Sequence, residues 1–206
     1  MAQVAVLSGP SHAEEVGKGL PTLIVAGARN LETAEKVQQF FMNEVFRVYT
    51  STDVIGIELG GSVKNVIALA AGIADGLGCG DNTKAALITR GLKEITGLGL
   101  AMGARYETLQ GLSGLGDLIV TCSSVHSRNR KAGYLMGQGY SMQEAMDQVQ
   151  MVVEGVYSAR AASALAARYE LTMPIIEAVN QILFQGKDAR EALHELMIRD
   201  ARPELS

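Results

Sequence analysis

Apolar positions in the first fifty residues fall into short runs separated by one amphipathic stretch. Runs rich in β-branched or aromatic residues at 4–7, 22–26 and 46–49 predict three strands, and residues 31–42 have the spacing of an amphipathic helix. Ser11 and Glu14 have capping-box spacing, so we expect a helix that opens at Ser11. Strands that alternate with helices predict a parallel or mixed sheet.

From Asp53 onward the strand pattern fades and apolar residues recur with helical spacing. The predicted helices cover residues 63–77, 83–102, 127–136, 142–151, 157–169, 174–184 and 189–198. Residues typical of helix ends mark several boundaries: Ser141 with Glu144, Asp188 with Glu191, Pro174 and Gly186. We therefore expect a mainly α protein whose larger part is all-α.

The predicted strands divide the chain into two unequal parts. Three short strands with two helices make a poor domain alone, because a small sheet leaves both of its edges in water. We expect residues 1–52 to be the last part of a larger α/β domain and residues 53–206 to form an all-α domain.

Composition excludes some classes of partner. Eighteen Lys and Arg against 22 Asp and Glu, with no long run of one sign, give no overall charge pattern for nucleic acid or an anionic membrane. Polar residues such as Glu58 and Lys64 interrupt the apolar stretch 54–74, so we expect no membrane span. The N-terminus lacks the pattern of a secretory signal, and we expect a cytoplasmic protein.

Isolated cysteines, histidines and serines give no metal or hydrolase pattern. Cys79 and Cys122 are far apart and the three histidines are scattered, so we expect no disulfide scaffold and no metal site. Ser11 stands beside His12, but the surrounding sequence lacks the second glycine of a nucleophile elbow. A serine hydrolase is therefore disfavoured.

Lys64 lies in a stretch, residues 60–72, that is apolar or small on every face, as in a fully buried helix. Its helical neighbours Gly60, Gly61, Ile67 and Ala68 include no carboxylate, and an unpaired buried ammonium is unfavourable. Its partner must come from elsewhere in the fold or from a ligand. The alternatives are a proton donor or acceptor, and a structural lysine paired across the core. The small residues around it allow close approach of another backbone or of a ligand.

A second candidate site combines a glycine-rich segment, residues 111–118, with a basic cluster at 128–131. A long helical region precedes these glycines, whereas a dinucleotide-binding loop follows a strand, so we reject a dinucleotide loop here. The glycines instead predict a sharp bend that presents Asp117, and together with the basic cluster they suggest an acidic and a basic group that face one cleft. Ser127 is a plausible cap for a helix that carries Arg128 and Asn129, and such a helix start suits a phosphate. The alternative is a solvated basic turn.

Six motifs, in chain order, together resemble the bacterial NAD(P)-dependent glycerol-3-phosphate dehydrogenases. The resemblance covers essentially the whole chain, and the lysine motif together with Ser127-Arg128-Asn129 is its most specific part. The motifs are residues 7–14, 56–66, 75–78, 86–91, 114–118 and 127–129.

This resemblance implies an oxidoreductase that interconverts sn-glycerol 3-phosphate and dihydroxyacetone phosphate with NAD or NADP, for phospholipid synthesis. It implies an all-α substrate domain, similar to the C-terminal domain of 6-phosphogluconate dehydrogenase, after a remnant of a Rossmann domain. Lys64 matches the catalytic lysine, which takes the C2 hydroxyl proton in one direction and returns it in the other. Other matching positions bind the substrate: Gly9, Ser11, Asp117, Ser127, Arg128 and Asn129. Four match positions that contact the dinucleotide: Ala13, Arg128, Val152 and Glu154.

The chain departs from the family pattern at its start. No Gly-x-Gly-x-x-Gly motif follows an N-terminal strand, so the first part of the nucleotide-binding domain and the family's second active-site lysine are missing. We expect the chain alone to be inactive, and the sequence leaves NAD and NADP as alternatives.

Two further interpretations of the function remain open. The chain could belong to another hydroxyacid dehydrogenase of the same superfamily, although the Ser-Arg-Asn triplet argues against it. It could instead be a non-catalytic helical module that binds phosphorylated metabolites or a partner protein.

Whichever interpretation holds, including the dehydrogenase, we expect a homodimer that associates through helices of the larger domain.

Overall fold

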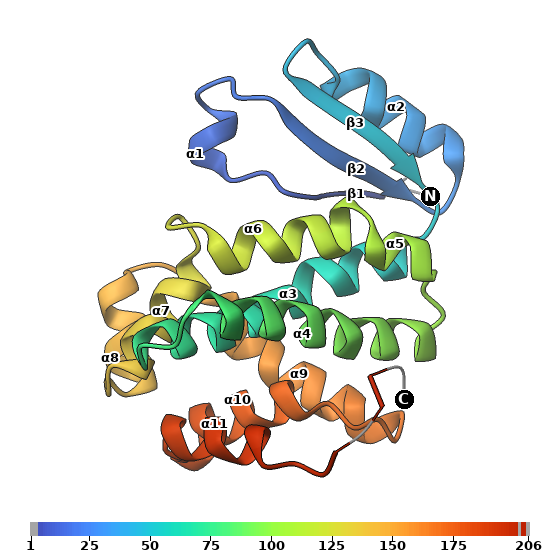
Figure 1. The fold of residues 1–206 in the computed structure, drawn as a ribbon. Coiled ribbons are helices and arrows are strands. Elements are labelled where there is room, and N and C mark those ends of the chain that lie inside the picture. Colours follow the sequence, from blue (N-terminus) through green and yellow to red (C-terminus); the bar gives the residue numbers. More distant parts are fainter. Residues whose placement is uncertain (1–3, 202, 205–206) are drawn as a thin grey trace.

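The computed structural model describes residues 4–201 and 203–204 and shows a small α/β lobe on a larger helical lobe (Figure 1). The α/β lobe contains β1 (Ala5–Ser8), α1 (Ala13–Val16), β2 (Thr22–Ala28), α2 (Leu31–Phe41) and β3 (Phe46–Ser51). The helical lobe contains α3 (Val54–Gly76), α4 (Asp81–Ala101), α5 (Tyr106–Gln110), the π-helical turn η1 (Leu112–Gly116), α6 (Asp117–Ser123), α7 (Arg128–Gly137), α8 (Met142–Val149), α9 (Glu154–Arg168), α10 (Pro174–Gln185) and α11 (Ala189–Met197). The mainly α fold predicted from the sequence is confirmed.

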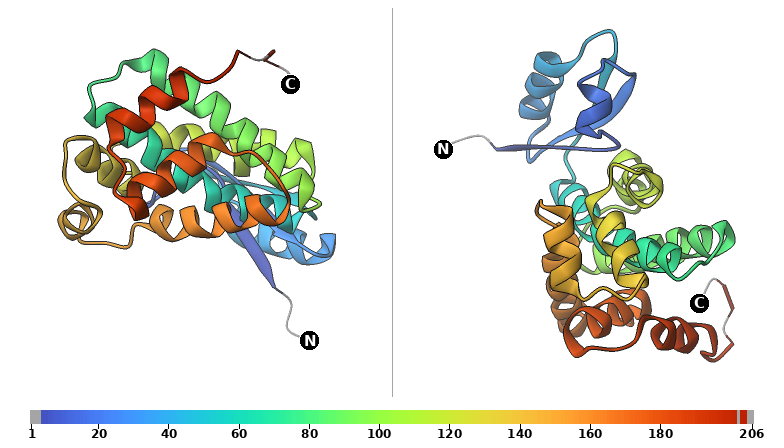
Figure 2. Two further views of the ribbon diagram at one scale, coloured as in Figure 1. Left: turned by 90° about the horizontal axis from the view of Figure 1, so that it is seen from below. Right: turned by 90° about the vertical axis from the view of Figure 1, so that its left-hand side faces the viewer.

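The sheet is mixed, as predicted. β1 pairs antiparallel with β2, and β2 pairs parallel with β3, so β2 lies in the centre. The parallel pair needs a crossover, which α2 supplies on one face of the sheet (Figure 2). Ile24, Ala26 and Val48 form the small core beneath it.

The predicted helix at Ser11 is wrong in its start. The helix α1 has only four residues and begins at Ala13, and the side chain of its N-cap residue His12 makes no capping hydrogen bond. Ser11 instead donates its hydroxyl to the carbonyl oxygen of Gly9 at 3.0 Å. The hydroxyl therefore closes the turn after β1, where Gly9 has a φ of +141° that favours glycine.

α3 is the central element of the helical lobe, and α4, α6, α7 and α9 pack around it (Figure 1). By length and hydropathy alone this helix could cross a membrane, contrary to our expectation from its polar residues. In the fold, 61% of its most apolar stretch is buried, as in the core helix of a bundle. It also begins nine residues earlier than the sequence predicts, because Asp53 caps it by accepting from the N–H of Gly56 at 2.9 Å.

Two glycines allow α3 and α7 to pack with their backbones in contact. A Cβ at Gly72 would collide with the carbonyl oxygen of Arg130, and a Cβ at Gly133 would collide with that of Leu69. Gly60 similarly faces the backbone of Ser113, at 2.6 Å from the position a Cβ would take. The predicted close approach of other backbones to this helix is confirmed.

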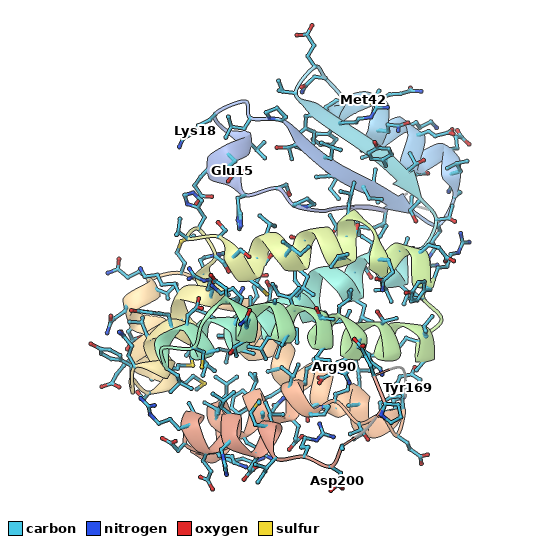
Figure 3. All side chains as sticks on the ribbon, in the orientation of Figure 1. Glu15, Lys18, Met42, Arg90, Tyr169 and Asp200 are labelled. Atoms are coloured by element: carbon cyan, nitrogen blue, oxygen red, sulfur yellow. The ribbon has the colours of Figure 1, made fainter. Side chains whose placement is uncertain are left out.

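Several other helix boundaries agree with the sequence pattern, although α5 and α6 were not predicted and α9 begins three residues before its predicted start. Ser141 and Glu144 form the predicted capping box, and Pro174 opens α10 while Gly186 ends it in the left-handed conformation. Asp188 caps α11 by accepting from the N–H groups of Arg190 and Glu191, but the predicted capping box is incomplete, because the Glu191 side chain does not bond back to Asp188. Arg90 on α4, labelled in Figure 3, donates to the carbonyl oxygen of Glu204 at 3.4 Å, so the segment after α11 contacts α4.

Candidate active site

Lys64 forms an ion pair with Asp117 inside the helical lobe. The lysine projects from the middle of α3, and Asp117 is the first residue of α6. Their side chains are only 16% and 7% exposed. The predicted partner of Lys64 from elsewhere in the fold is therefore Asp117.

The glycine-rich segment carries Asp117 to the lysine, but not by the predicted sharp bend. Residues 112–116 form the π-helical turn η1, which runs directly into α6. Gly114 lies so close to Leu109 that a Cβ there would collide with its carbonyl oxygen. The sequence pattern missed this because π-helical turns are rare and have no simple periodicity.

Burial raises the pKa of Asp117, and three neighbours act in the opposite direction, Lys64 most strongly. Thr121 donates its hydroxyl to the Asp117 backbone carbonyl at 2.6 Å and lies 3.4 Å from the carboxylate. His12 from the α/β lobe also lowers the pKa of this carboxyl. A carboxylate held in this way can orient the ammonium group of a lysine, while the lysine remains free to exchange its proton.

Ser127, Arg128 and Asn129 lie at the start of α7, as predicted. Ser127 caps the helix by accepting from the N–H of Arg130 at 3.2 Å. Asn129 is buried and donates from Nδ2 to Oδ1 of Asn65, the residue after Lys64, at 3.0 Å. The start of α7 is thus tied to the segment of α3 that carries the lysine.

α9 completes this network. The N–H of Gly155 donates to Oδ1 of Asn129 at 2.8 Å, and Asn65 donates from Nδ2 to Glu154 at 3.1 Å. Glu154 also lies 3.8 Å from the guanidinium of Arg128. A continuous polar network therefore joins α3, α7 and α9 beside the ion pair of Lys64 and Asp117.

The members of the basic cluster point in different directions. Arg130 turns away and forms an ion pair with Asp75 at 2.6 Å, and Lys84 binds the same carboxylate at 3.0 Å. Lys131 is exposed. Only Arg128 joins the polar network beside Lys64, because residues two apart on a helix point in different directions.

The turn after β1 brings Gly9 and Ser11 close to the same region. Its Pro10 lies 3.8 Å from the position a Cβ of Gly116 would take, one residue before Asp117. Ala13 and Val152 are both exposed, and they make no hydrogen bond or ion pair that ties them to Lys64. Of the residues matched to the dinucleotide, Arg128 and Glu154 are the two that the structure joins directly.

Sequence reasoning assigned no role to Asn65, Thr121 or His12. Asn65 is a polar residue in an otherwise apolar helix, and Thr121 stands one helical turn after Asp117, so both carried a signal. His12 gave none, because its neighbours in the site come from other elements of the fold.

A cavity of about 610 Å³ lies apart from this site, between α9, α10 and α11. None of the candidate site residues lines it.

Comparison with known proteins agrees with the two-lobe structure. Residues 53–194 match the family model described as NAD-dependent glycerol-3-phosphate dehydrogenase C-terminus, and residues 1–34 match the corresponding N-terminus model. The chain belongs to the NAD-dependent glycerol-3-phosphate dehydrogenase family. The resemblance seen in the sequence motifs is confirmed, and it disfavours another hydroxyacid dehydrogenase.

Relatives and solved structures in this family are close. A glycerol-3-phosphate dehydrogenase [NAD(P)+] from Agathobacter rectalis is 69% identical over 100% of this chain and 61% of its own length. One from Fusobacterium nucleatum is 64% identical over 98% of this chain and 61% of its own length. The Coxiella burnetii enzyme structure has a TM-score of 0.94 at 42% identity, over 97% of this chain and 61% of that one. The chain thus spans about three fifths of the length of these family members.

Proposed function

We propose that this chain provides the substrate-binding and proton-transfer part of an enzyme that interconverts sn-glycerol 3-phosphate and dihydroxyacetone phosphate with NAD or NADP. The observation that carries the proposal is the buried ion pair of Lys64 and Asp117 beside the start of α7. Membership of the family and relatives that carry this name support it.

Lys64 is the proposed proton carrier. In oxidation its neutral amine takes the proton of the C2 hydroxyl, and in reduction its ammonium returns a proton to the C2 oxygen as the carbonyl becomes a hydroxyl. Asp117 accepts a hydrogen bond from this ammonium and orients it toward the substrate. Burial of the pair excludes water, so the positive charge on Lys64 strongly stabilises the developing alkoxide.

The start of α7 is the proposed phosphate site. Arg128 is partly exposed, carries the positive charge and can reach a ligand, and N–H groups at a helix start favour an anion. Asn129 is held by Asn65 and Gly155, so it fixes this helix start relative to Lys64. Ser127 completes the substrate trio, and Gly9 and Ser11 are proposed to close over the substrate from the α/β lobe.

Ala13, Arg128, Val152 and Glu154 are the proposed contacts of this chain with the dinucleotide. They fit such a group, because Ala13 and Val152 offer small or apolar exposed side chains, and Glu154 is 57% exposed although Asn65 and Arg128 hold it. Held by these residues, a dinucleotide would supply hydride transfer at C2 of the substrate.

We infer that residues 1–52 complete a nucleotide-binding domain together with a further segment, and that residues 53–206 are the substrate domain. Two separate hydrophobic cores support this division, and so do exposed apolar side chains on the α/β lobe, such as that of Phe40, which is 82% exposed.

We also propose that the protein works in the cytoplasm as a homodimer that associates through the helical lobe. Sedimentation at micromolar concentration tests the dimer, and a monomer would contradict it.

Calorimetric titration of the chain with sn-glycerol 3-phosphate and with dihydroxyacetone phosphate tests the function. We expect saturable binding that Arg128→Ala abolishes, with circular dichroism as the control for folding. Binding that persists in the Arg128→Ala variant would contradict the proposed phosphate site. Phosphate-ester binding without redox activity, even when the missing segment is supplied, would favour a non-catalytic module.

A further inference from the structure

His12 is a polar residue beside the site that the proposed mechanism does not use. Its Nε2 atom is shielded from solvent and has no hydrogen-bond partner among residues 4–201 and 203–204. A buried imidazole nitrogen without a partner is unfavourable, and such groups in native proteins call for an explanation.

The position of His12 is informative. It follows Ser11 between β1 and α1, and β1 runs along the side of the α/β lobe that faces the helical lobe (Figure 1). His12 is near enough to Asp117 to contribute to lowering the pKa of that carboxyl group. Its ring faces that of His126, with centroids 6.0 Å apart and planes at 59°. His126 directly precedes Ser127, so His12 lies near the start of α7 as well as near the partner of Lys64.

We propose that His12 is a substrate-binding residue whose Nε2 forms a hydrogen bond with an oxygen atom of the phosphorylated three-carbon substrate. This inference rests on the proposed function, because it takes the substrate to lie between Lys64 and the start of α7. The substrate offers hydroxyl, carbonyl and phosphate oxygens, and an imidazole can donate to any of them. The proposal requires Nε2, which is shielded from solvent in this structure, to become accessible when the substrate binds.

The chain contains three histidines, so magnetic resonance of their ring nitrogens can follow each one separately. We expect sn-glycerol 3-phosphate to shift the ring signals of His12 saturably and to leave those of His194, on the distant α11, unchanged. Inorganic phosphate and glycerol serve as partial ligands. A shift with phosphate alone assigns the contact to the phosphate group, and a shift with the ester only assigns it to the glycerol part.

Two variants separate the ring from its nitrogen. His12→Phe keeps an aromatic ring that can pack on His126 but removes Nε2, and we expect it to weaken binding of sn-glycerol 3-phosphate by about tenfold or more. His12→Gln places an amide near the position of Nε2 and should recover part of the affinity. His194→Gln is the matched control and should bind like the parent chain.

The outcomes are distinguishable. If the parent chain does not bind the ester at all, both the proposed function and this inference fail. If the parent chain binds and Arg128→Ala abolishes binding, while His12→Phe binds normally, only the inference about His12 fails. If the His12→Phe variant does not fold, the ring signals of the parent chain decide, and an unchanged His12 at saturation overturns the inference.

Discussion

Asn129 on α7 donates a hydrogen bond from Nδ2 to Oδ1 of Asn65 on α3 at 3.0 Å. Asn65 directly follows Lys64, the proposed proton carrier on α3. Asn129 directly follows Arg128, the proposed phosphate-binding residue on α7. The bond is buried and therefore rigid, so it fixes the distance between the proton carrier and the phosphate site. The two helices of the site thus behave as one unit.

Asn129→Ala breaks this unit. It leaves Oδ1 of Asn65 and the N–H of Gly155 without their partners, and we expect a loss of about 1–3 kcal/mol in the free energy of unfolding. Urea denaturation followed by circular dichroism measures it. Ser62→Ala is the control, because its hydroxyl bonds only at the exposed surface. Equal stability of the Asn129→Ala variant and the parent chain would show that water replaces the asparagine.

Lys64→Met should abolish turnover in the complete enzyme and destabilise this chain by about 3–5 kcal/mol, because Asp117 is left buried without its partner. Adding Asp117→Asn removes the unpaired charge and should restore most of the stability but no turnover. Unfolding midpoints of the two single variants and the double variant give the coupling free energy between Lys64 and Asp117. Turnover rates of the same three variants in the complete enzyme test the role of Lys64. Additive losses of stability would contradict a direct ion pair.

Gly72→Ala tests the contact between α3 and α7. The new methyl group collides with the Arg130 carbonyl oxygen and must push the helices apart, so we expect a loss of about 1–3 kcal/mol and weaker binding of the phosphate ester. Gly97→Ala on α4 is the matched control, because apart from its own helical turn no atom lies within 4 Å of its new methyl group. That control should gain about 0.5–1 kcal/mol from its better helix propensity. Thermal unfolding compares the two.

Glu94 predicts a pH dependence of stability far from the active site. It accepts from the N–H groups of Ile175 and Ile176 at the start of α10, yet burial raises its pKa to about 7. Between about pH 4.5 and 7 the unfolded chain loses this proton and the folded chain keeps it, so stability falls as the pH rises, by about 3 kcal/mol.

Glu94→Gln should flatten this part of the pH profile, which urea denaturation at pH 4.5, 6 and 7.5 measures. Glu177→Gln is the control, since this exposed carboxylate accepts a hydrogen bond only from the side chain of Gln181 among the described residues. A profile with the same slope in the Glu94→Gln variant would assign the pH dependence to other groups.

The sequence by itself determined the elements with strong local signals. Ser141 with Glu144, Pro174 and Gly186 set helix boundaries through their own backbone and side-chain preferences, and these were confirmed. Apolar periodicity likewise predicted the helical lobe and the mixed sheet. The lack of a local carboxylate around Lys64 required a partner from elsewhere in the fold, which is a statement about local spacing.

Only the tertiary structure decided which residues meet. Asp117 reaches Lys64 through a π-helical turn that has no sequence period, and Arg130 turns to Asp75 although it lies two residues from Arg128. Such pairings depend on the rotation and separation of whole helices, which the glycine contacts of α3 and α7 fix. Ser11 likewise closes a turn rather than capping a helix, because hydroxyl groups choose among partners that only the fold brings within reach.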